Sequence, residues 1–219
     1  MITRMTQLCR PSPLSTLLTA MIVLAWLLSA FHLDLPLFSS QRSALLLNIG
    51  AIDGATLRQG EIWRLVSSQF LHVHFLHMLF NLLSIYVLSN SIEHEVGKLA
   101  LVLSYFVGGT VGQYFGVFFR PDLVSSGASQ ALMALCGFVL ASSRRLILPR
   151  FTVATAIVVT VIQSVLDVAV STSIKPGHGF GFAAGVAIGL GAIAFLGRWS
   201  ALKRVTQGVA PVDDVSSRL

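Results

Sequence analysis

The chain has 219 residues, of which 54% are hydrophobic and 11% are charged, and its mean hydropathy is +0.79. A soluble domain of this length buries too little surface to hide so many apolar side chains, so the composition excludes an ordinary soluble protein. The formal net charge of +6 comes from lysines and arginines scattered in short segments beside apolar runs, which excludes a basic face for nucleic acid. We therefore expect an all-α integral membrane protein surrounded by a lipid bilayer.

Six apolar runs predict a bundle of six transmembrane helices, because about 20 helical residues cross a hydrocarbon core of about 30 Å. The run at 75–92 is the weakest, and the run at 151–166 is long enough only if it includes Asp167 and beyond. These boundaries predict a cytoplasmic N-terminal segment at 1–13, a membrane-embedded domain at 14–197 and a cytoplasmic tail at 198–219. The six runs are 11–33, 75–92, 99–119, 123–143, 151–166 and 176–197.

The distribution of basic residues predicts the orientation of the bundle. With the N-terminus in the cytoplasm, ten of the fifteen lysines and arginines lie inside, so the positive-inside rule favours two cytoplasmic termini. A cleaved signal peptide is the alternative for the first run. The sequence leaves the oligomeric state open. The ten residues are Arg4, Arg10, Lys98, Arg144, Arg145, Arg150, Arg198, Lys203, Arg204 and Arg218.

An outer loop of about forty residues joins the first two helices. It mixes apolar patches with charged residues, which is too apolar for a disordered connector. We expect this loop to pack against the bundle, with Trp63 at the membrane interface. A small folded cap without membrane contact is the alternative.

A polar cluster opens the second helix, where His72, His74, His77 and Asn81 interrupt an apolar segment. Polar side chains at membrane depth require partners, so the cluster indicates an interior site. His77 and Asn81 are four residues apart and share one helical face. A zinc site is one alternative, but no Cys, Asp or Glu lies nearby and the HExxH pattern is absent, so we expect neither metal nor cofactor. Histidines buried in the core are the other alternative.

Small and polar residues mark the segments that follow. Glu93 and His94 are expected in a solvated inner turn, and Gly108, Gly112 and Gly116 form a stripe suited to close helix packing. Near the end of the fifth helix, Asp167 is a candidate to orient a catalytic histidine. The sequence favours the other interpretation, in which Asp167 fixes a helix end or loop near the outer interface.

Ser129 stands two residues after Gly127, where a polar loop becomes an uncharged helix. A serine at the positive end of a helix suits a nucleophile. The alternative is a serine that serves helix packing.

His178 begins a helix in which Gly181, Gly185 and Gly189 recur every four residues. These glycines lie on the same side of the helix as the histidine, and they permit a neighbouring backbone to approach closely. We therefore expect His178 to meet Ser129. A packing face with an incidental histidine is the alternative.

Taken together, the motifs resemble those of the rhomboid family of intramembrane serine proteases. The resemblance covers about 60–189, through GEIWR, HVHFLHMLFN, Glu93 with Gly97, GAS at Ser129 and HGFGFAAG at His178. It implies a six-helix bundle with a cavity open to the outside, Ser129 as nucleophile and His178 as general base.

The resemblance also implies how the charged intermediate is held and what is cut. The oxyanion would be bound by the Ser129 N–H, His72 and Asn81, with Gly127 beside them and His77 behind. Substrates would be transmembrane proteins. Independently of the resemblance, a bacterial plasma membrane is the expected location, because the chain is compact and shows no extra domain.

Two positions depart from the family pattern, and two other functions stay open. Gln130 follows the serine where glycine is usual, and Ser89 replaces a glycine before Glu93. Gln130 is the only support for a catalytically inactive rhomboid-like protein that binds membrane helices. The residues that argue against this alternative are Ser129, His178, His72 and Asn81. A small transporter is a weaker alternative, because the chain has neither an inverted repeat nor an intramembrane acidic pair.

Overall fold

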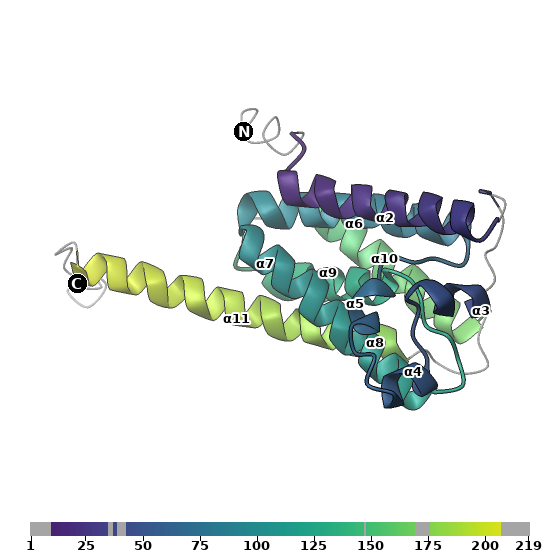
Figure 1. The fold of residues 1–219 in the computed structure, drawn as a ribbon. Coiled ribbons are helices and arrows are strands. Elements are labelled where there is room, and N and C mark those ends of the chain that lie inside the picture. The colour runs from purple at the N-terminus through teal and green to yellow at the C-terminus, as the bar shows by residue number, and fades with distance from the viewer. Residues whose placement is uncertain (1–9, 35–36, 39–42, 147, 170–175, 207–219) are drawn as a thin grey trace, which may run out of the picture.

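The computed structural model describes residues 10–34, 37–38, 43–146, 148–169 and 176–206, with side chains described as far as residue 197 (Figure 1). The helices of this part of the chain are α2 (Pro13–His32), α3 (Ser43–Leu46), η1 (Leu47–Ile49), α4 (Gly54–Arg58), α5 (Arg64–Ser67), α6 (Phe75–Glu95), α7 (Lys98–Val102), η2 (Leu103–Val107), α8 (Gly108–Phe119), α9 (Ser129–Ser142), α10 (Arg150–Ala169) and α11 (Pro176–Thr206).

The predicted helical membrane bundle is confirmed, with five of the six expected helices long enough to cross a membrane. Five segments are long and apolar enough to cross a membrane: α2, α6, the continuous α7–η2–α8 segment, α10 and α11 up to Gly197. The sixth is α9, whose 14 residues extend only about 21 Å. Because that is shorter than a hydrocarbon core of about 30 Å, the first residue of α9 can lie below the membrane surface.

Helix α9 forms the centre of the bundle, where every residue from Ser129 to Val139 is buried. The neighbours α6, α8, α10 and α11 lie around it. The core includes Phe138, Leu132 and Leu135 from α9 together with Tyr105 from η2. Because α9 is enclosed on all sides, its position is fixed by its neighbours.

Helices α9 and α11 run parallel and interlock through glycines. A Cβ atom added to Gly181, Gly185 or Gly189 would lie 2.4, 1.9 or 2.9 Å from the carbonyl oxygen of residue 130, 134 or 138, respectively. The constant offset of 51 residues means that the two helices rise together. Their N-terminal ends, which carry Ser129 and His178, therefore lie side by side.

The glycines of α8 also allow α9 and α11 to pack closely against α8. A Cβ on Gly112 would meet the Gln130 side chain and the Gly177 carbonyl oxygen, each at 2.7 Å. The segment leading to α8 was expected as one regular helix, but residues 103–107 form a π-helical turn. Such a turn contains an extra residue and rotates the side chains that follow it.

The outer loop packs against the bundle as predicted, through the short helices α3, η1, α4 and α5. Asp53 caps α4 by accepting a hydrogen bond from the Thr56 N–H at 2.8 Å, and this bond lowers the pKa of the carboxyl group. Arg64 links two parts of the outer loop by donating hydrogen bonds to the carbonyl oxygens of Leu47 and Ala51. Trp63 is 53% exposed, in keeping with a surface position at the interface.

The inner turn differs from the solvated loop that the sequence predicts. Glu93 is only 8% exposed, and its carboxylate accepts hydrogen bonds from the Leu14 and Ser15 N–H groups at 3.2 and 2.9 Å. These are unpaired donors at the start of α2, where a negative charge is favourable. Glu93 therefore ties the end of α6 to the beginning of α2, while His94 contacts the Arg10 carbonyl oxygen at 3.0 Å.

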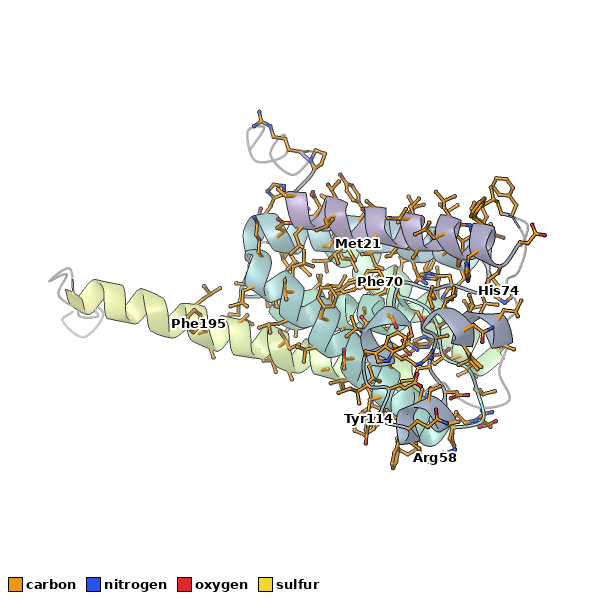
Figure 2. The ribbon with its side chains drawn as sticks, in the orientation of Figure 1. Met21, Arg58, Phe70, His74, Tyr114 and Phe195 are labelled. Atoms are coloured by element: carbon orange, nitrogen blue, oxygen red, sulfur yellow. The ribbon has the colours of Figure 1, made fainter. Side chains whose placement is uncertain are left out.

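Large apolar side chains project outward from the long helices, as a lipid-facing surface requires. Met21 on α2, Tyr114 on α8 and Phe195 on α11 point away from the bundle, whereas Phe70 lies inside it (Figure 2). Helix α11 continues past residue 197 to Thr206 and projects beyond the other helices (Figure 1). Residues 1–9 and 207–219, on which the predictions of a cytoplasmic segment and tail largely depend, lie outside the described part of the chain.

Candidate active site

Ser129 and His178 meet at the shared N-terminal end of α9 and α11. Ser129 Oγ lies 2.8 Å from His178 Nε2, and the two side chains are 3% and 4% exposed. Ser129 is the first residue of α9, so its N–H has no intrahelical carbonyl to bind. The arrangement pairs a hydroxyl with a possible proton acceptor in a buried environment.

Asp167 contacts the other side of the same imidazole. Its Oδ2 lies 2.7 Å from His178 Nδ1, and its Oδ1 accepts a hydrogen bond from Gln163 Nε2 at 3.1 Å. Both residues are on α10 and are 6% exposed. The expectation that Asp167 fixes a helix end or loop is wrong for the described structure, because its carboxylate bonds are to these two side chains.

A small space beside Gly127 adjoins the serine. A Cβ atom added to Gly127 would lie 3.6 Å from Ser129 Oγ, 3.9 Å from Ser129 N and 3.5 Å from His77 Cε1. Gly127 has φ +134°, which disfavours any residue with a side chain. The absent side chain leaves room where a carbonyl oxygen attacked by Ser129 could sit.

His72, in the segment before α6, and His77, on α6, reverse the expected arrangement, in which His72 binds the oxyanion and His77 stands behind it. His77 lines the cavity at the serine, whereas His72 is fully buried behind it. His72 Nε2 accepts the Ala128 N–H at 3.2 Å, so this nitrogen carries no proton and Asn81 Nδ2, also at 3.2 Å, must donate to it. His72 Nδ1–H then faces the Phe70 carbonyl oxygen at 3.3 Å.

These bonds leave His72 with no free hydrogen for an oxyanion, and Asn81 is likewise 0% exposed. Burial lowers the pKa of His72 to about 3, which keeps the ring neutral. His72 and Asn81 therefore hold the backbone just before Ser129. Of the polar groups expected at the oxyanion or behind it, the Ser129 N–H and the His77 ring are the ones beside the space at Gly127.

The loop that leads into Ser129 is tied to two other elements. The Gly127 N–H donates to the Ser68 carbonyl oxygen at 2.9 Å, and the Gly127 carbonyl oxygen accepts from Gln113 Nε2 at 3.1 Å. Ser125 donates to Gln113 Oε1 at 2.6 Å and pairs with Ile52 of the outer loop. The backbone at the site is thus fixed before any substrate arrives, which is a condition for electrostatic stabilisation.

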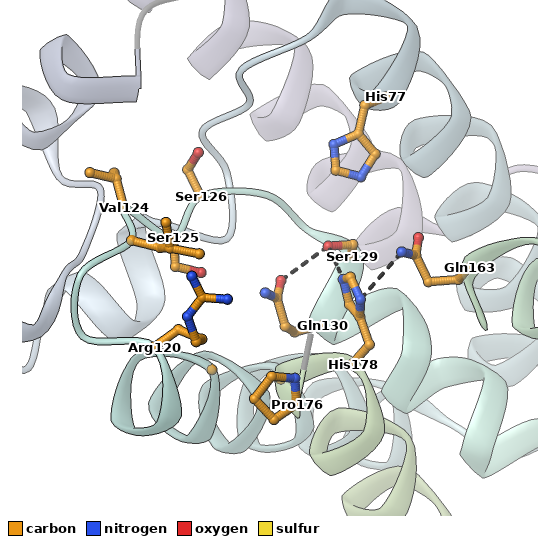
Figure 3. A pocket seen from close by; sticks show the side chains of 13 residues that line it. His77, Arg120, Val124, Ser125, Ser126, Ser129, Gln130, Gln163, Pro176 and His178 are labelled. Atoms are coloured by element: carbon orange, nitrogen blue, oxygen red, sulfur yellow. Dashed lines mark hydrogen bonds between the residues drawn. The ribbon is translucent and has the colours of Figure 1, made fainter. Parts of the chain in front are cut away.

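Gln130 competes for the serine proton. Its Oε1 lies 3.2 Å from Ser129 Oγ, which donates to it, while His178 Nε2 lies nearer on another side of the hydroxyl (Figure 3). The side chain fits against Gly112 and Gly177 and leaves the Ser129–His178 contact intact. Gln130 in place of glycine therefore adds a second acceptor without separating the pair.

The site opens into a cavity of about 150 Å³. Polar groups from α6, α9, α10, α11 and the loop before α9 converge on it, and Arg120 lies at one side, toward Ser125 (Figure 3). In the part of the chain that is described, no group of three His, Cys, Asp or Glu side chains could hold a metal ion. The cavity is lined by His77, Gly116, Arg120, Leu123, Val124, Ser125, Ser126, Ser129, Gln130, Gln163, Pro176, Gly177 and His178.

Helix α10 turns one face inward, and this face carries Asp167, which the sequence offered as a candidate to orient a catalytic histidine. Its buried residues Thr152, Ala156, Val159, Gln163 and Asp167 are spaced three or four apart, which defines one inward face. The last two are polar and fall at the level of His178. Their four-residue spacing at the end of an apolar helix was the available signal.

Comparison with known proteins agrees with this arrangement. A family model for the Rhomboid domain matches residues 59–195. Rhomboid protease GluP of Bacillus subtilis (strain 168) is 32% identical over 159 residues, which cover 69% of this chain and 31% of that protein. RHOMBOID-like protein 4 of Arabidopsis thaliana is 32% identical over 155 residues, covering 67% and 38%. Inactive RHOMBOID-like protein 8 of the same plant is 32% identical over 82 residues, covering 37% and 23%.

The chain spans less than two fifths of the length of each of these relatives. The matched residues nevertheless make up more than half of the chain and include all the groups that gather at Ser129. This integral membrane protein belongs to the rhomboid family.

Proposed function

We propose that the protein is an intramembrane serine endopeptidase that cleaves transmembrane proteins in or near their membrane-spanning segments. The observation that carries the proposal is the 2.8 Å contact between Ser129 Oγ and His178 Nε2 in a buried cavity. A hydroxyl becomes a competent nucleophile when an adjacent base takes its proton. The relative named as a protease supports the same reaction class.

In the first half of the reaction, neutral His178 accepts the Ser129 proton as Oγ attacks the peptide carbonyl carbon. The imidazolium then donates that proton to the leaving amine, and an acyl-enzyme remains. In the second half, His178 accepts a proton from water as the water oxygen attacks the acyl carbon. The imidazolium then returns this proton to Ser129 Oγ as the bond between Oγ and the acyl carbon breaks, which releases the acid product and restores Ser129. The polar lining of the cavity supports access of that water.

The negative charge that develops on the carbonyl oxygen would be bound in the space beside Gly127. The Ser129 N–H and the His77 ring border that space and are the proposed donors. A donor aimed at this position typically contributes about 3 kcal/mol to transition-state stabilisation. His72 and Asn81 would act indirectly, by holding the Ala128 N–H in place.

The substrate class follows from the depth of the site. A backbone in helical form hides its carbonyl groups, so a transmembrane segment must unwind locally before Ser129 can reach one. Small or helix-breaking residues near the cut would make unwinding easier. We further propose a bacterial plasma membrane with both termini in the cytoplasm. The basic residues near the inner turns support this orientation.

A purified full-length protein in liposomes tests the function directly. The wild type is expected to cut a fluorescent single-span reporter and to react with a fluorophosphonate, with the adduct mapped to Ser129 by mass spectrometry. An adduct elsewhere, or cleavage that persists after complete labelling, would overturn the assignment of the nucleophile. Reporter binding without cleavage or labelling would favour an inactive helix-binding protein, the alternative that Gln130 supports.

Replacing Gln130 by methionine is expected to raise kcat by roughly 2–10-fold, because the serine proton loses an acceptor worth about 0.5–1.5 kcal/mol and remains directed at His178. Methionine keeps the approximate length of the side chain against Gly112 and Gly177. Reporter cleavage under saturating conditions gives kcat. A kcat that falls, with folding intact, would mean that the Gln130 amide assists the reaction.

A further inference from the structure

We propose that Asp167 is a positioning residue that fixes the tautomer of His178, so that this chain works with three linked residues rather than with a serine–histidine pair alone. The inference rests on the proposed protease function. It goes beyond that function because it assigns a role to a carboxylate on a helix that contributes neither the nucleophile nor the base.

Two short contacts connect Asp167 to His178 and His178 to Ser129. Asp167 Oδ2 lies 2.7 Å from His178 Nδ1, and His178 Nε2 lies 2.8 Å from Ser129 Oγ. Asp167 and His178 are 6% and 4% exposed, so both contacts are shielded from water. The residues come from α10, α11 and α9, and only the packing of these helices brings them together.

These two contacts determine which nitrogen of His178 carries the proton. A carboxylate only accepts hydrogen bonds, so the short contact places the proton of neutral His178 on Nδ1. Nε2 then presents a lone pair to the Ser129 hydroxyl, which is the form that a general base requires. As the imidazolium forms, the same carboxylate lies beside the new positive charge and stabilises it.

Gln163 fixes the carboxylate in turn. Its Nε2 donates to Asp167 Oδ1 at 3.1 Å, one helical turn away. The same Nε2 lies 3.2 Å from His178 Nδ1 (Figure 3), and because both nitrogens carry hydrogen in the proposed tautomer, this contact is not a hydrogen bond in that tautomer. The neighbours of Asp167 on α10, such as Leu166 and Val168, are exposed to the exterior at 46% and 69%. A carboxylate turned inward on such an apolar helix, with a partner at each oxygen, is typical of a functional group at membrane depth.

Kinetics of Asp167→Asn in liposomes test the role. The asparagine amide can donate to Nδ1 and favour the tautomer with its proton on Nε2, so kcat is expected to fall by roughly 10³–10⁴-fold with KM little changed. Asp167→Glu, which retains the carboxylate, is expected to recover part of this loss. Ser164→Ala, an exposed hydroxyl on the same helix, is the matched control and should cleave at the wild-type rate.

Solid-state nitrogen NMR of protein labelled at histidine gives a readout that a purely structural role would not change. Wild-type His178 should carry its proton on Nδ1, and Asp167→Asn should move it to Nε2. A wild-type proton on Nε2 would overturn the proposal even if every Asp167 variant failed to fold. Normal kcat in a folded Asp167→Asn protein would also overturn it, while leaving the proposed protease function in place. Failure of the wild type to cleave or label would instead refute the protease function, and the tautomer measurement would still decide the role of Asp167.

Discussion

Replacing either Ser129 or His178 by alanine is expected to lower kcat for reporter cleavage by roughly 10⁶-fold, and replacing both is expected to lower it no further. The reason is the contact between Ser129 Oγ and His178 Nε2. Each residue acts only through the other, because the hydroxyl needs the base and, without the serine, no acyl-enzyme forms for His178 and water to hydrolyse. Losses from residues that act as one unit do not add.

The measurement compares the two single variants and the double variant in liposomes, with active-site labelling beside cleavage. Ser129→Ala should lose the fluorophosphonate adduct completely, and His178→Ala should label far more slowly than the wild type. Ser143→Ala, at the opposite end of α9, controls for the loss of a helix hydroxyl and should retain both activities. A single variant that keeps a tenth of the wild-type rate would remove that residue from the proposed mechanism.

The meeting of Ser129 and His178 could be expected from the sequence because the evidence is local to each segment. Ser129 begins a helix after a glycine, and His178 begins another whose glycines permit close approach. A glycine stripe on a membrane helix predicts a neighbouring backbone, although it does not identify that backbone. In the structure the neighbour is α9, and the parallel course of the two helices brings their first turns together.

The roles of His72 and His77 could not be separated in the same way. Helical periodicity relates His77 to Asn81, but His72 lies before α6, where the chain is extended at His74. Outside a helix, the direction of a side chain depends on tertiary contacts, and here the Ala128 N–H draws His72 into the interior. Likewise, the contact between Asp167 and His178 depends on how α10 is rotated relative to α11, and only the packing of the helices determines that rotation.

Gly185 provides the sharpest test of how packing positions the site. A Cβ atom there would lie 1.9 Å from the Ala134 carbonyl oxygen and 2.8 Å from the Ala134 Cα, and α9 is enclosed by its neighbours. Because backbone atoms cannot move aside as a flexible side chain can, Gly185→Ala is expected to lower the free energy of unfolding by about 1–3 kcal/mol or more. It should also reduce cleavage by roughly 10²-fold, since separating α9 from α11 by about 1 Å displaces His178 from Ser129.

Gly191→Ala is the matched control on the same helix, because a Cβ atom at Gly191 would meet nothing within 4 Å. Its free energy of unfolding and its cleavage rate should not fall, as alanine has the higher helix propensity. Both variants can be compared by unfolding in the same detergent and by reporter cleavage. Equal stability and activity in the two variants would mean that α9 and α11 can separate without cost, and the glycine stripe would then not set the distance between nucleophile and base. If Gly185→Ala strongly reduces the cleavage rate but only slightly lowers the free energy of unfolding, the distance between nucleophile and base is more sensitive to the substitution than the stability of the fold is.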